Sequence, residues 1–126
     1  MSEIATLRTA LLELHRELLE VQRIQAERFG GRMSAGEVLQ AAAEDLRFDW
    51  LRALSQLIGQ LDEAAAAVSD EPEGVEVAAA RTRELLAPPD PETTFGARYL
   101  QALQDHPGVV LAHRSVTAAL ERFPRA

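Results

Sequence analysis

The chain has 126 residues, of which 47% are apolar and 26% charged, close to the averages of a soluble globular domain. Cysteine and lysine are both absent, which excludes disulfides, thiolate catalysis, cysteine-bound metals and lysine-based chemistry. The net charge is −7, with 11 acidic and 7 basic residues over 1–63 and 9 acidic and 6 basic residues over 64–126. Because neither half is basic, we expect no binding to nucleic acid or to an anionic membrane surface.

The length predicts one domain over residues 1–126, large enough to bury an apolar core without disulfides. The first residues, Met1 to Ile4, lack the basic and apolar regions of a signal peptide. No stretch approaches the ~18 uncharged apolar residues of a membrane span, so we expect a cytoplasmic protein.

The first predicted helix begins at Ser2, whose side chain can cap it, and runs to about Phe29. The pair Gly30–Gly31 then supplies a stop. Apolar residues spaced by three and four form one side of this helix: Ile4, Leu7, Leu11, Leu14, Leu18 and Val21. The opposite side carries charges of alternating sign, which is typical of a solvent-exposed face.

The second predicted helix begins at Ser34, which can form a capping box with Glu37, and ends at about Glu44. Asp45 can cap a third and longer helix over residues 46–68. The large apolar side chains of this third helix are Phe48, Trp50, Leu51, Leu54, Leu57, Ile58 and Leu61.

Residues 69–74 form a predicted loop, because this stretch is polar and contains proline and glycine. A fourth helix is predicted over residues 75–87. The prolines within residues 88–91 end it, since proline cannot continue a helix.

A fifth helix, capped by Asp90 or Thr93, reaches about Asp105. Pro107 suits the first turn of a sixth helix, which ends near Phe123. No segment alternates apolar and polar residues as a half-buried strand does. We therefore predict an all-α, single-domain bundle of five or six helices, in which the first and third form a long antiparallel pair.

The three histidines are the first candidates for chemistry: His15, His106 and His113. None has a glutamate three residues before it, and a proline separates the last two, so the spacing favours no metal site. His113 has valines at helical spacing, which is typical of a half-buried histidine with one hydrogen-bonded nitrogen. No serine lies in a nucleophile-elbow pattern, and no phosphate-binding glycine loop is present. We predict no metal ion and no cofactor, and the residues favour a non-enzyme without deciding the question.

A line of polar residues runs along the apolar side of the first helix. Arg8, His15 and Gln22 are spaced by seven residues, and buried polar groups need partners or a wet groove. Asp62, on the third helix, has the matching polar character among apolar neighbours. The candidate polar seam or pocket consists of Arg8, His15, Gln22, Asp62, Trp50 and His113. A buried structural network explains the same pattern, and we favour it over a functional pocket.

Two small residues share the stripe of Asp62. Ser55 and Gly59 would allow another helix to come close to the third helix. A glycine inside a helix costs about 1 kcal/mol relative to alanine, so Gly59 predicts a packing or ligand contact.

Three stretches carry a resemblance: Phe48-Asp49-Trp50-Leu51-Arg52-Ala53-Leu54-Ser55 with Ile58 and Leu61-Asp62-Glu63; Phe95, Arg98-Tyr99-Leu100, Leu103-Gln104 and Pro107; and Arg32 with Glu37-Val38-Leu39-Gln40. Over nearly the whole chain they resemble a family of small uncharacterised bacterial helical proteins. Asp45-Leu46 and Arg52-Ala53 depart from that family's pattern, which has proline after each of the two charged residues. The resemblance implies a bacterial all-helical domain, and it carries over no site residue because that family has no established activity.

Three classes of function fit these features. We expect a non-enzymatic interaction or assembly protein that self-associates as a homodimer, because the apolar side of the first helix is wider than one core contact needs. A two-fold axis would then bring Gln22 and His15 of two copies together, unless the short helices cover that side. The alternative is a small-molecule-binding bundle with a polar pocket between the first and third helices. An enzyme, the third class, would use His15 or His113 as a base beside Asp62.

Overall fold

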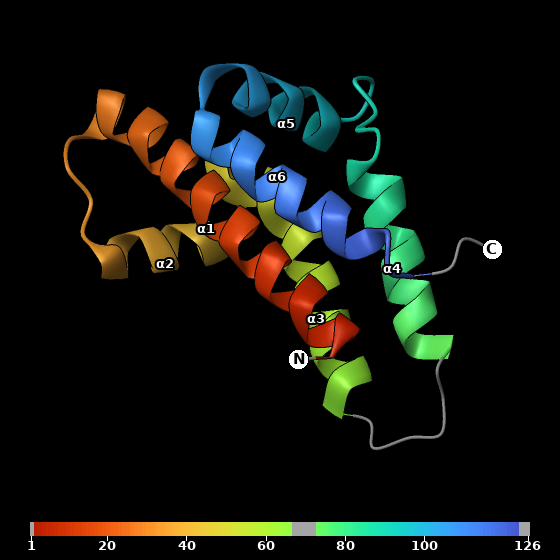
Figure 1. Cartoon of the computed structure of the whole chain (residues 1–126). Helices are drawn as coiled ribbons and strands as arrows, with labels where there is room; N and C mark the ends of the chain where they lie inside the picture. The colour runs from red at the N-terminus through yellow and green to blue at the C-terminus, as the bar shows by residue number, and fades with distance from the viewer. Residues whose placement is uncertain (1, 67–72, 124–126) are drawn as a thin grey trace.

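The computed structural model describes residues 2–66 and 73–123, and every regular element within them is helical (Figure 1). The elements in chain order are α1 (Glu3–Gly30), α2 (Ala35–Glu44), the 3₁₀ helix η1 (Leu46–Leu51), α3 (Arg52–Ala66), α4 (Glu73–Leu86), α5 (Thr94–Asp105) and α6 (Pro107–Leu120). The prediction of an all-α fold is confirmed.

The predicted ends of α1 are confirmed. The Ser2 side chain accepts a hydrogen bond from the backbone N–H of Ala5 at 3.2 Å, which satisfies one of the free donors of the first turn. Gly31 follows the last residue with a φ of 80°, in the left-handed region that glycine adopts without strain.

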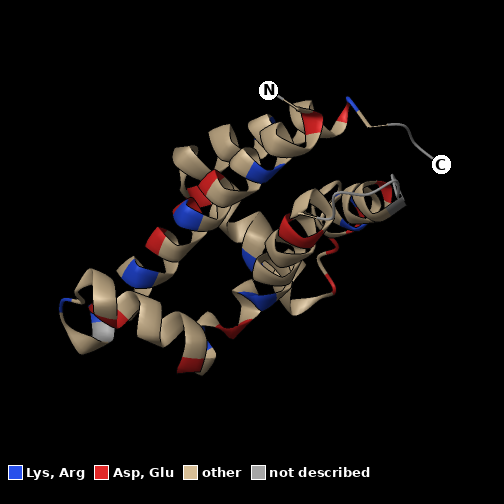
Figure 2. Ribbon diagram, turned by 90° about the horizontal axis from the view of Figure 1, so that it is seen from below, with Lys and Arg blue, Asp and Glu red and all other residues tan. Residues whose placement is uncertain are grey.

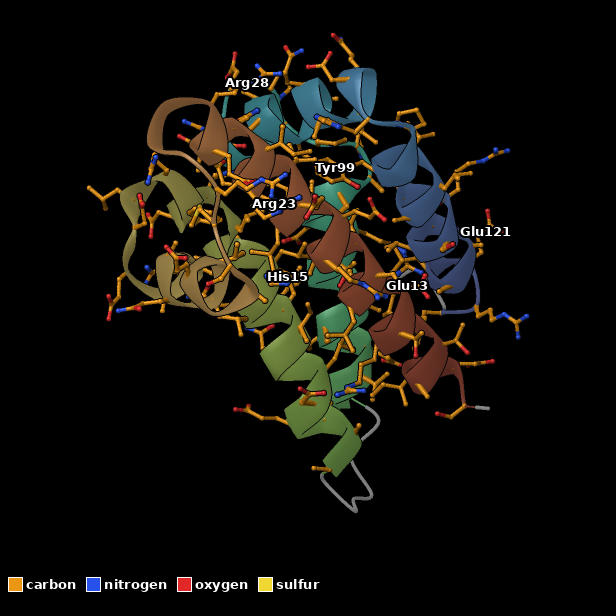
Figure 3. The ribbon with its side chains drawn as sticks, turned by 90° about the vertical axis from the view of Figure 1, so that its left-hand side faces the viewer. Glu13, His15, Arg23, Arg28, Tyr99 and Glu121 are labelled. Carbon is orange, nitrogen blue, oxygen red and sulfur yellow. The ribbon has the colours of Figure 1, made fainter. Side chains whose placement is uncertain are left out.

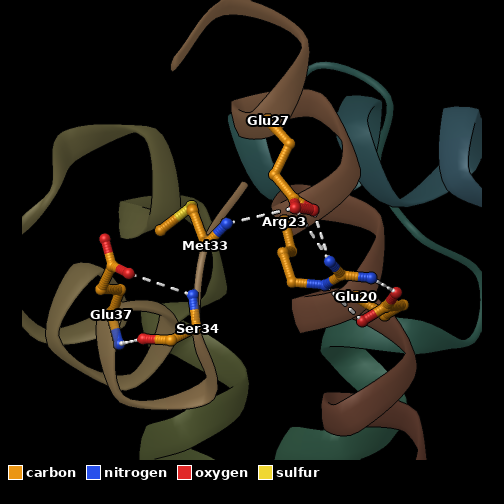
Figure 4. Close-up of polar contacts among 6 residues, drawn as sticks. All are labelled: Glu20, Arg23, Glu27, Met33, Ser34 and Glu37. Atoms are coloured by element: carbon orange, nitrogen blue, oxygen red, sulfur yellow. Dashed lines mark hydrogen bonds and ion pairs between the residues drawn. The ribbon is translucent and has the colours of Figure 1, made fainter. Parts of the chain in front are cut away.

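The turn between α1 and α2 is held by charged side chains (Figure 4). Arg23 forms ion pairs with Glu20 and Glu27 along α1. A carboxylate oxygen of Glu27 also accepts a hydrogen bond from the backbone N–H of Met33 at 3.2 Å. Because one carboxylate serves both the helix and the turn, the direction in which the chain leaves α1 is fixed.

The segment after α2 differs from the prediction. The capping box of Ser34 and Glu37 is present, and Asp45 accepts a hydrogen bond from the backbone N–H of Arg47 at 2.8 Å. The helix that Asp45 caps is a 3₁₀ helix, however, and the α-helix starts only at Arg52. The tighter winding buries three of its six side chains, those of Phe48, Trp50 and Leu51. Residues 67 and 68, the predicted end of this helix, lie outside the described residues.

The helix α4 starts two residues earlier than predicted. Glu73 and Gly74 belong to the helix and not to the loop, while residues 69–72 lie outside the described residues. The other end of the helix, Leu86, agrees with the prediction to within one residue.

The start of α5 depends on a close backbone approach. Thr93, one of the two predicted caps, accepts a hydrogen bond from the backbone N–H of Gly96 at 2.9 Å. A Cβ atom at Gly96 would lie 2.5 Å from the carbonyl carbon of Asp90. The preceding loop can therefore fold over the helix only because residue 96 has no side chain. Pro107 occupies the first turn of α6, as predicted.

α1 packs between α6 on one side and α3 on the other (Figure 3). Its most extensive partner is α6, whereas the sequence pointed to the third helix. Small residues of α6 face α1, namely Gly108, Ala112 and Ser115. At Gly108 a Cβ atom would lie 2.6 Å from Oε2 of Glu17, so the two helices are close there.

The apolar side of α1 is therefore covered mostly within the chain. Leu7, Leu11, Leu14 and Leu18 are fully buried, and Leu19 is partly buried. Leu12 remains 38% exposed beside them. Of the two arrangements left open by the sequence, the one in which a short helix covers the second side of α1 is observed.

Arg83 joins α4 to the end of α6. Its guanidinium donates hydrogen bonds to the backbone carbonyls of Leu120 and Phe123, each at 2.6 Å. The last carbonyls of a helix lack partners within the helix and carry partial negative charge, so a cation there is doubly favourable.

The packing contact expected at Gly59 is not observed. Nothing lies within 4 Å of the position that its Cβ would occupy, and the residue is exposed. No packing contact of the described residues explains a glycine at this point of α3.

Charged residues of both signs are spread over the helices (Figure 2). Within residues 2–66 and 73–123, no helix combines the length and the apolar character that a membrane crossing requires.

Candidate functional site

Three polar contacts join α1 to α3 and η1, and they contain five of the six candidate residues. Arg8 forms an ion pair with Asp62. His15 is hydrogen-bonded through Nε2 to Oγ of Ser55 at 2.9 Å. Their order along the two helices is opposite, so α3 runs antiparallel to α1 at this seam.

The third contact continues the seam into η1. The indole N–H of Trp50 donates a hydrogen bond to Oε1 of Gln22 at 2.8 Å. The three contacts together are called the α1–α3 seam below: Arg8–Asp62, His15–Ser55 and Gln22–Trp50. Each of the three predicted polar residues on α1 thus has a hydrogen-bond or ion-pair partner on α3 or η1.

The seam changes from exposed to buried along its length. The side chains of Arg8 and Asp62 are 44% and 47% exposed, so their ion pair contributes about 0–1 kcal/mol. Gln22 and Trp50 are only 3% and 9% exposed. Their hydrogen bond is structurally important, because losing one partner would leave the other buried and unsatisfied.

His15 lies between α1 and α3 (Figure 3). Burial lowers the pKa of His15 below its ordinary value, which favours the neutral ring. Oγ of Ser55 also lies 3.4 Å from the backbone carbonyl of Leu51, which is a second possible acceptor for its hydroxyl. Asp62 pairs with Arg8 instead of orienting the ring, so these residues do not form the serine–histidine–aspartate arrangement of a hydrolase.

His113, the sixth candidate, lies elsewhere. Its Nδ1 is hydrogen-bonded to the hydroxyl of Tyr99 on α5 at 2.6 Å. Burial raises the pKa of Tyr99 and lowers that of His113, so both side chains are held in their neutral forms. The expectation of a half-buried histidine with one bonded nitrogen is confirmed.

An aromatic row connects His113 to the seam. The ring centroids of Trp50 and Phe95 are 5.9 Å apart, those of Phe95 and Tyr99 5.4 Å, and those of Tyr99 and His113 5.5 Å. Figure 3 shows Tyr99 on a different element from His15. Such ring contacts stabilise a core, and this row ties α5 and α6 to η1.

A recess opens next to Trp50. It has a volume of about 180 Å³ and lies between α1, η1 and α5, with Val21 and Ala102 among its lining residues. The sequence placed a pocket between the first and third helices, where the side chains of the seam instead bond to each other. Within the described residues, no group of three or more histidine or acidic side chains is arranged to hold a metal ion.

Three residues of this region were not singled out as partners from the sequence: Ser55, Phe95 and Tyr99. Ser55 was detectable, because it lies on the stripe of Asp62 seven residues away, as His15 lies seven from Arg8. The contact of Tyr99 with His113 depends on how the chain turns between α5 and α6, which no local pattern specifies.

Comparisons with protein families, curated proteins and solved structures find no match for this chain. The resemblance to a family of small bacterial helical proteins therefore stays a prediction.

Proposed function

We propose that the chain is a non-enzymatic interaction protein that associates with a second copy of itself through α2 and the start of η1. The observation that carries this proposal is the exposure of two leucines, Leu39 at 68% and Leu46 at 86%. Large apolar side chains that stay in water are typical of interaction sites when they gather on one surface.

The proposed surface differs from the one that the sequence suggested. α6 occupies the second side of α1, so the exposed large apolar side chains left on α1 for a dimer are Leu12 and Ile24, each only 38% exposed. On α2, by contrast, only Val38 is buried. We call Ala35, Leu39 and Ala43, which are spaced by four residues, together with Leu46, the α2 apolar surface.

The spacing of these residues suits a two-fold contact. With the axis at Leu39, two antiparallel copies of α2 would place the leucines against each other and Ala35 of one copy beside Ala43 of the other. Small side chains on both sides of the leucine pair let two helix backbones come close.

The size of the surface limits the strength of association. α2 has 10 residues, about 15 Å of helix, which is small against the ~1,200–2,000 Å² that specific interfaces bury. Each copy also carries a net charge of −7. We therefore expect a dissociation constant on the order of 10 µM or weaker, and tighter association as added salt screens the repulsion.

Sedimentation equilibrium over a range of protein concentrations tests this proposal. The wild type is expected to rise above its monomer mass of 13.8 kDa with concentration, and Leu39→Glu and Leu46→Glu are expected to stay monomeric. Leu111→Glu is the matched control, because Leu111 is 63% exposed on α6 and should associate like the wild type. A wild type that remains a monomer at all concentrations refutes self-association, and an equal effect of Leu111→Glu refutes the assignment to α2.

The alternative from the sequence, a ligand pocket between α1 and α3, has less support. The polar groups there satisfy one another, and the buried side-chain oxygen without a partner in the described residues, Oε1 of Gln60, lies outside the seam. A ligand would have to displace protein hydrogen bonds to bind at the seam, with a corresponding loss of affinity.

A further inference from the structure

We propose that the recess between α1, η1 and α5 binds a small organic carboxylate with a flat apolar body. This site is separate from the α2 apolar surface, and it does not depend on self-association. Its floor is apolar and buried, since Val21, Trp50 and Ala102 are 4%, 9% and 3% exposed. The other five lining residues are polar: Gln25, Arg98, Gln101, Asp105 and His106. Small-molecule sites likewise combine an apolar floor with polar groups that fix the orientation of the ligand.

The rim supplies the charge selectivity. Arg98 lies at the mouth of the recess, and its side chain has no ion pair or hydrogen bond with any residue of 2–66 or 73–123. An arginine without a protein partner can bind a carboxylate with two parallel hydrogen bonds. Arg98 is therefore the expected anchor for the ligand's negative charge.

Of the other charged and titratable groups of the rim, His106 can favour an anion, whereas Asp105 carries a like charge. His106, which precedes α6, makes no capping hydrogen bond with its side chain and can donate one to a ligand. The acidic residue of the rim, Asp105, already accepts a hydrogen bond from the side chain of Gln101 at 2.8 Å. An anion at Arg98 thus competes with no ion pair within the described residues.

The size and the floor define the body of the ligand. A volume of about 180 Å³ is below the ~300–1,000 Å³ of sites for drug-sized molecules, so the ligand is small. The Trp50 indole contributes to the floor, and aromatic surfaces favour the stacking of planar groups. Benzoate combines a planar ring and one carboxylate and is the probe of choice.

The single tryptophan gives a specific readout. Because Trp50 is the only tryptophan of the chain, its indole N–H gives one resonance in a ¹H–¹⁵N spectrum, which a ligand in the recess would shift. We expect a saturable shift with benzoate, with a dissociation constant on the order of 1 mM. Benzamide, which lacks the charge, and benzylamine, which reverses it, are expected to bind at least about fivefold more weakly.

The decisive variant is Arg98→Gln, which removes the charge from an exposed position and is expected to weaken benzoate binding about tenfold. The matched control is Arg114→Gln, which makes the same change on the exposed side of α6 and should bind like the wild type. Absence of saturation up to roughly 20 mM benzoate overturns the site. Equal binding of benzamide or benzylamine, or equal weakening by the two arginine variants, overturns the role of Arg98.

Discussion

The same substitution, glycine to alanine, is expected to have opposite effects at two positions of the bundle. At Gly59, in the middle of α3, an added methyl group would meet nothing within 4 Å. At Gly96, in the first turn of α5, it would lie 2.5 Å from the carbonyl carbon and 2.9 Å from the backbone nitrogen of Asp90. Because these atoms belong to the backbone, no side-chain rotation can relieve the overlap.

The magnitudes follow from helix propensity and packing. Gly59→Ala is expected to raise the free energy of unfolding by about 1 kcal/mol, since alanine loses less conformational freedom in a helix. Gly96→Ala is expected to lower it by about 3 kcal/mol or more, because overpacking against backbone outweighs the same propensity gain. For 126 residues, about 0.26 kcal/mol/K of unfolding entropy converts these values to Tm changes of about +4 °C and −12 °C.

Thermal unfolding followed by circular dichroism and urea denaturation measure both changes on the same protein preparations. Gly108→Ala is a useful third variant, because the obstacle there is the flexible end of the Glu17 side chain, and its effect should lie between the other two. If Gly96→Ala were as stable as the wild type, the close approach of the loop to α5 would be refuted. If Gly59→Ala were destabilising, an unrecognised contact at α3 would be required.

Three further changes test other contacts. Gln22→Leu is expected to cost about 1–3 kcal/mol of unfolding free energy in urea denaturation, because it leaves the buried N–H of Trp50 without an acceptor; a neutral result would contradict that role. Arg83→Met is expected to cost about 2 kcal/mol or more in the same assay, since two charge-assisted bonds to the end of α6 are lost, and Arg83→Lys should recover only part of the loss. Burial lowers the pKa of His15 and His113 in the folded protein below the ordinary histidine pKa of 6.5. As the pH falls through this range, the unfolded chain therefore binds more protons than the folded one, and the free energy of unfolding is expected to fall from about pH 7.5 to about pH 5.5. The double variant His15→Gln/His113→Gln should have a flatter profile over this range, and an unchanged slope would contradict the assignment.

The α1–α3 seam illustrates what periodicity can reveal. Arg8, His15 and Gln22 repeat every seven residues within an apolar side, and such a line needs partners on whichever helix packs against it. The pairing of Arg8 with Asp62 agrees with that reasoning, and His15 and Gln22 also find partners on the neighbouring segment. The pattern indicated that partners were needed, whereas the identity of Ser55 as a partner depended on the register between two helices.

Other features could not be read from local patterns. Phe48, Leu51 and Leu54 are spaced by three, which suits both an α-helix and a 3₁₀ helix. The apolar spacing therefore could not predict the change from a 3₁₀ helix to an α-helix at Arg52. The choice of α6 as the main partner of α1 depends on small side chains such as Gly108 and Ala112, which carry little hydrophobic signal. Helix starts marked by a side-chain cap, such as that of α2 at Ser34, were predicted because a cap acts within four residues.

The packing of α1 against α6 has a consequence for synthesis. α1 is complete when residue 30 has been added, but its most extensive partner begins only at Pro107. At ~5–20 residues per second, translation leaves the four buried leucines of α1 without that partner for several seconds. The nascent chain therefore presents an apolar helix that a holding chaperone can bind, and its native core closes only after the segment containing α6 has left the ribosome.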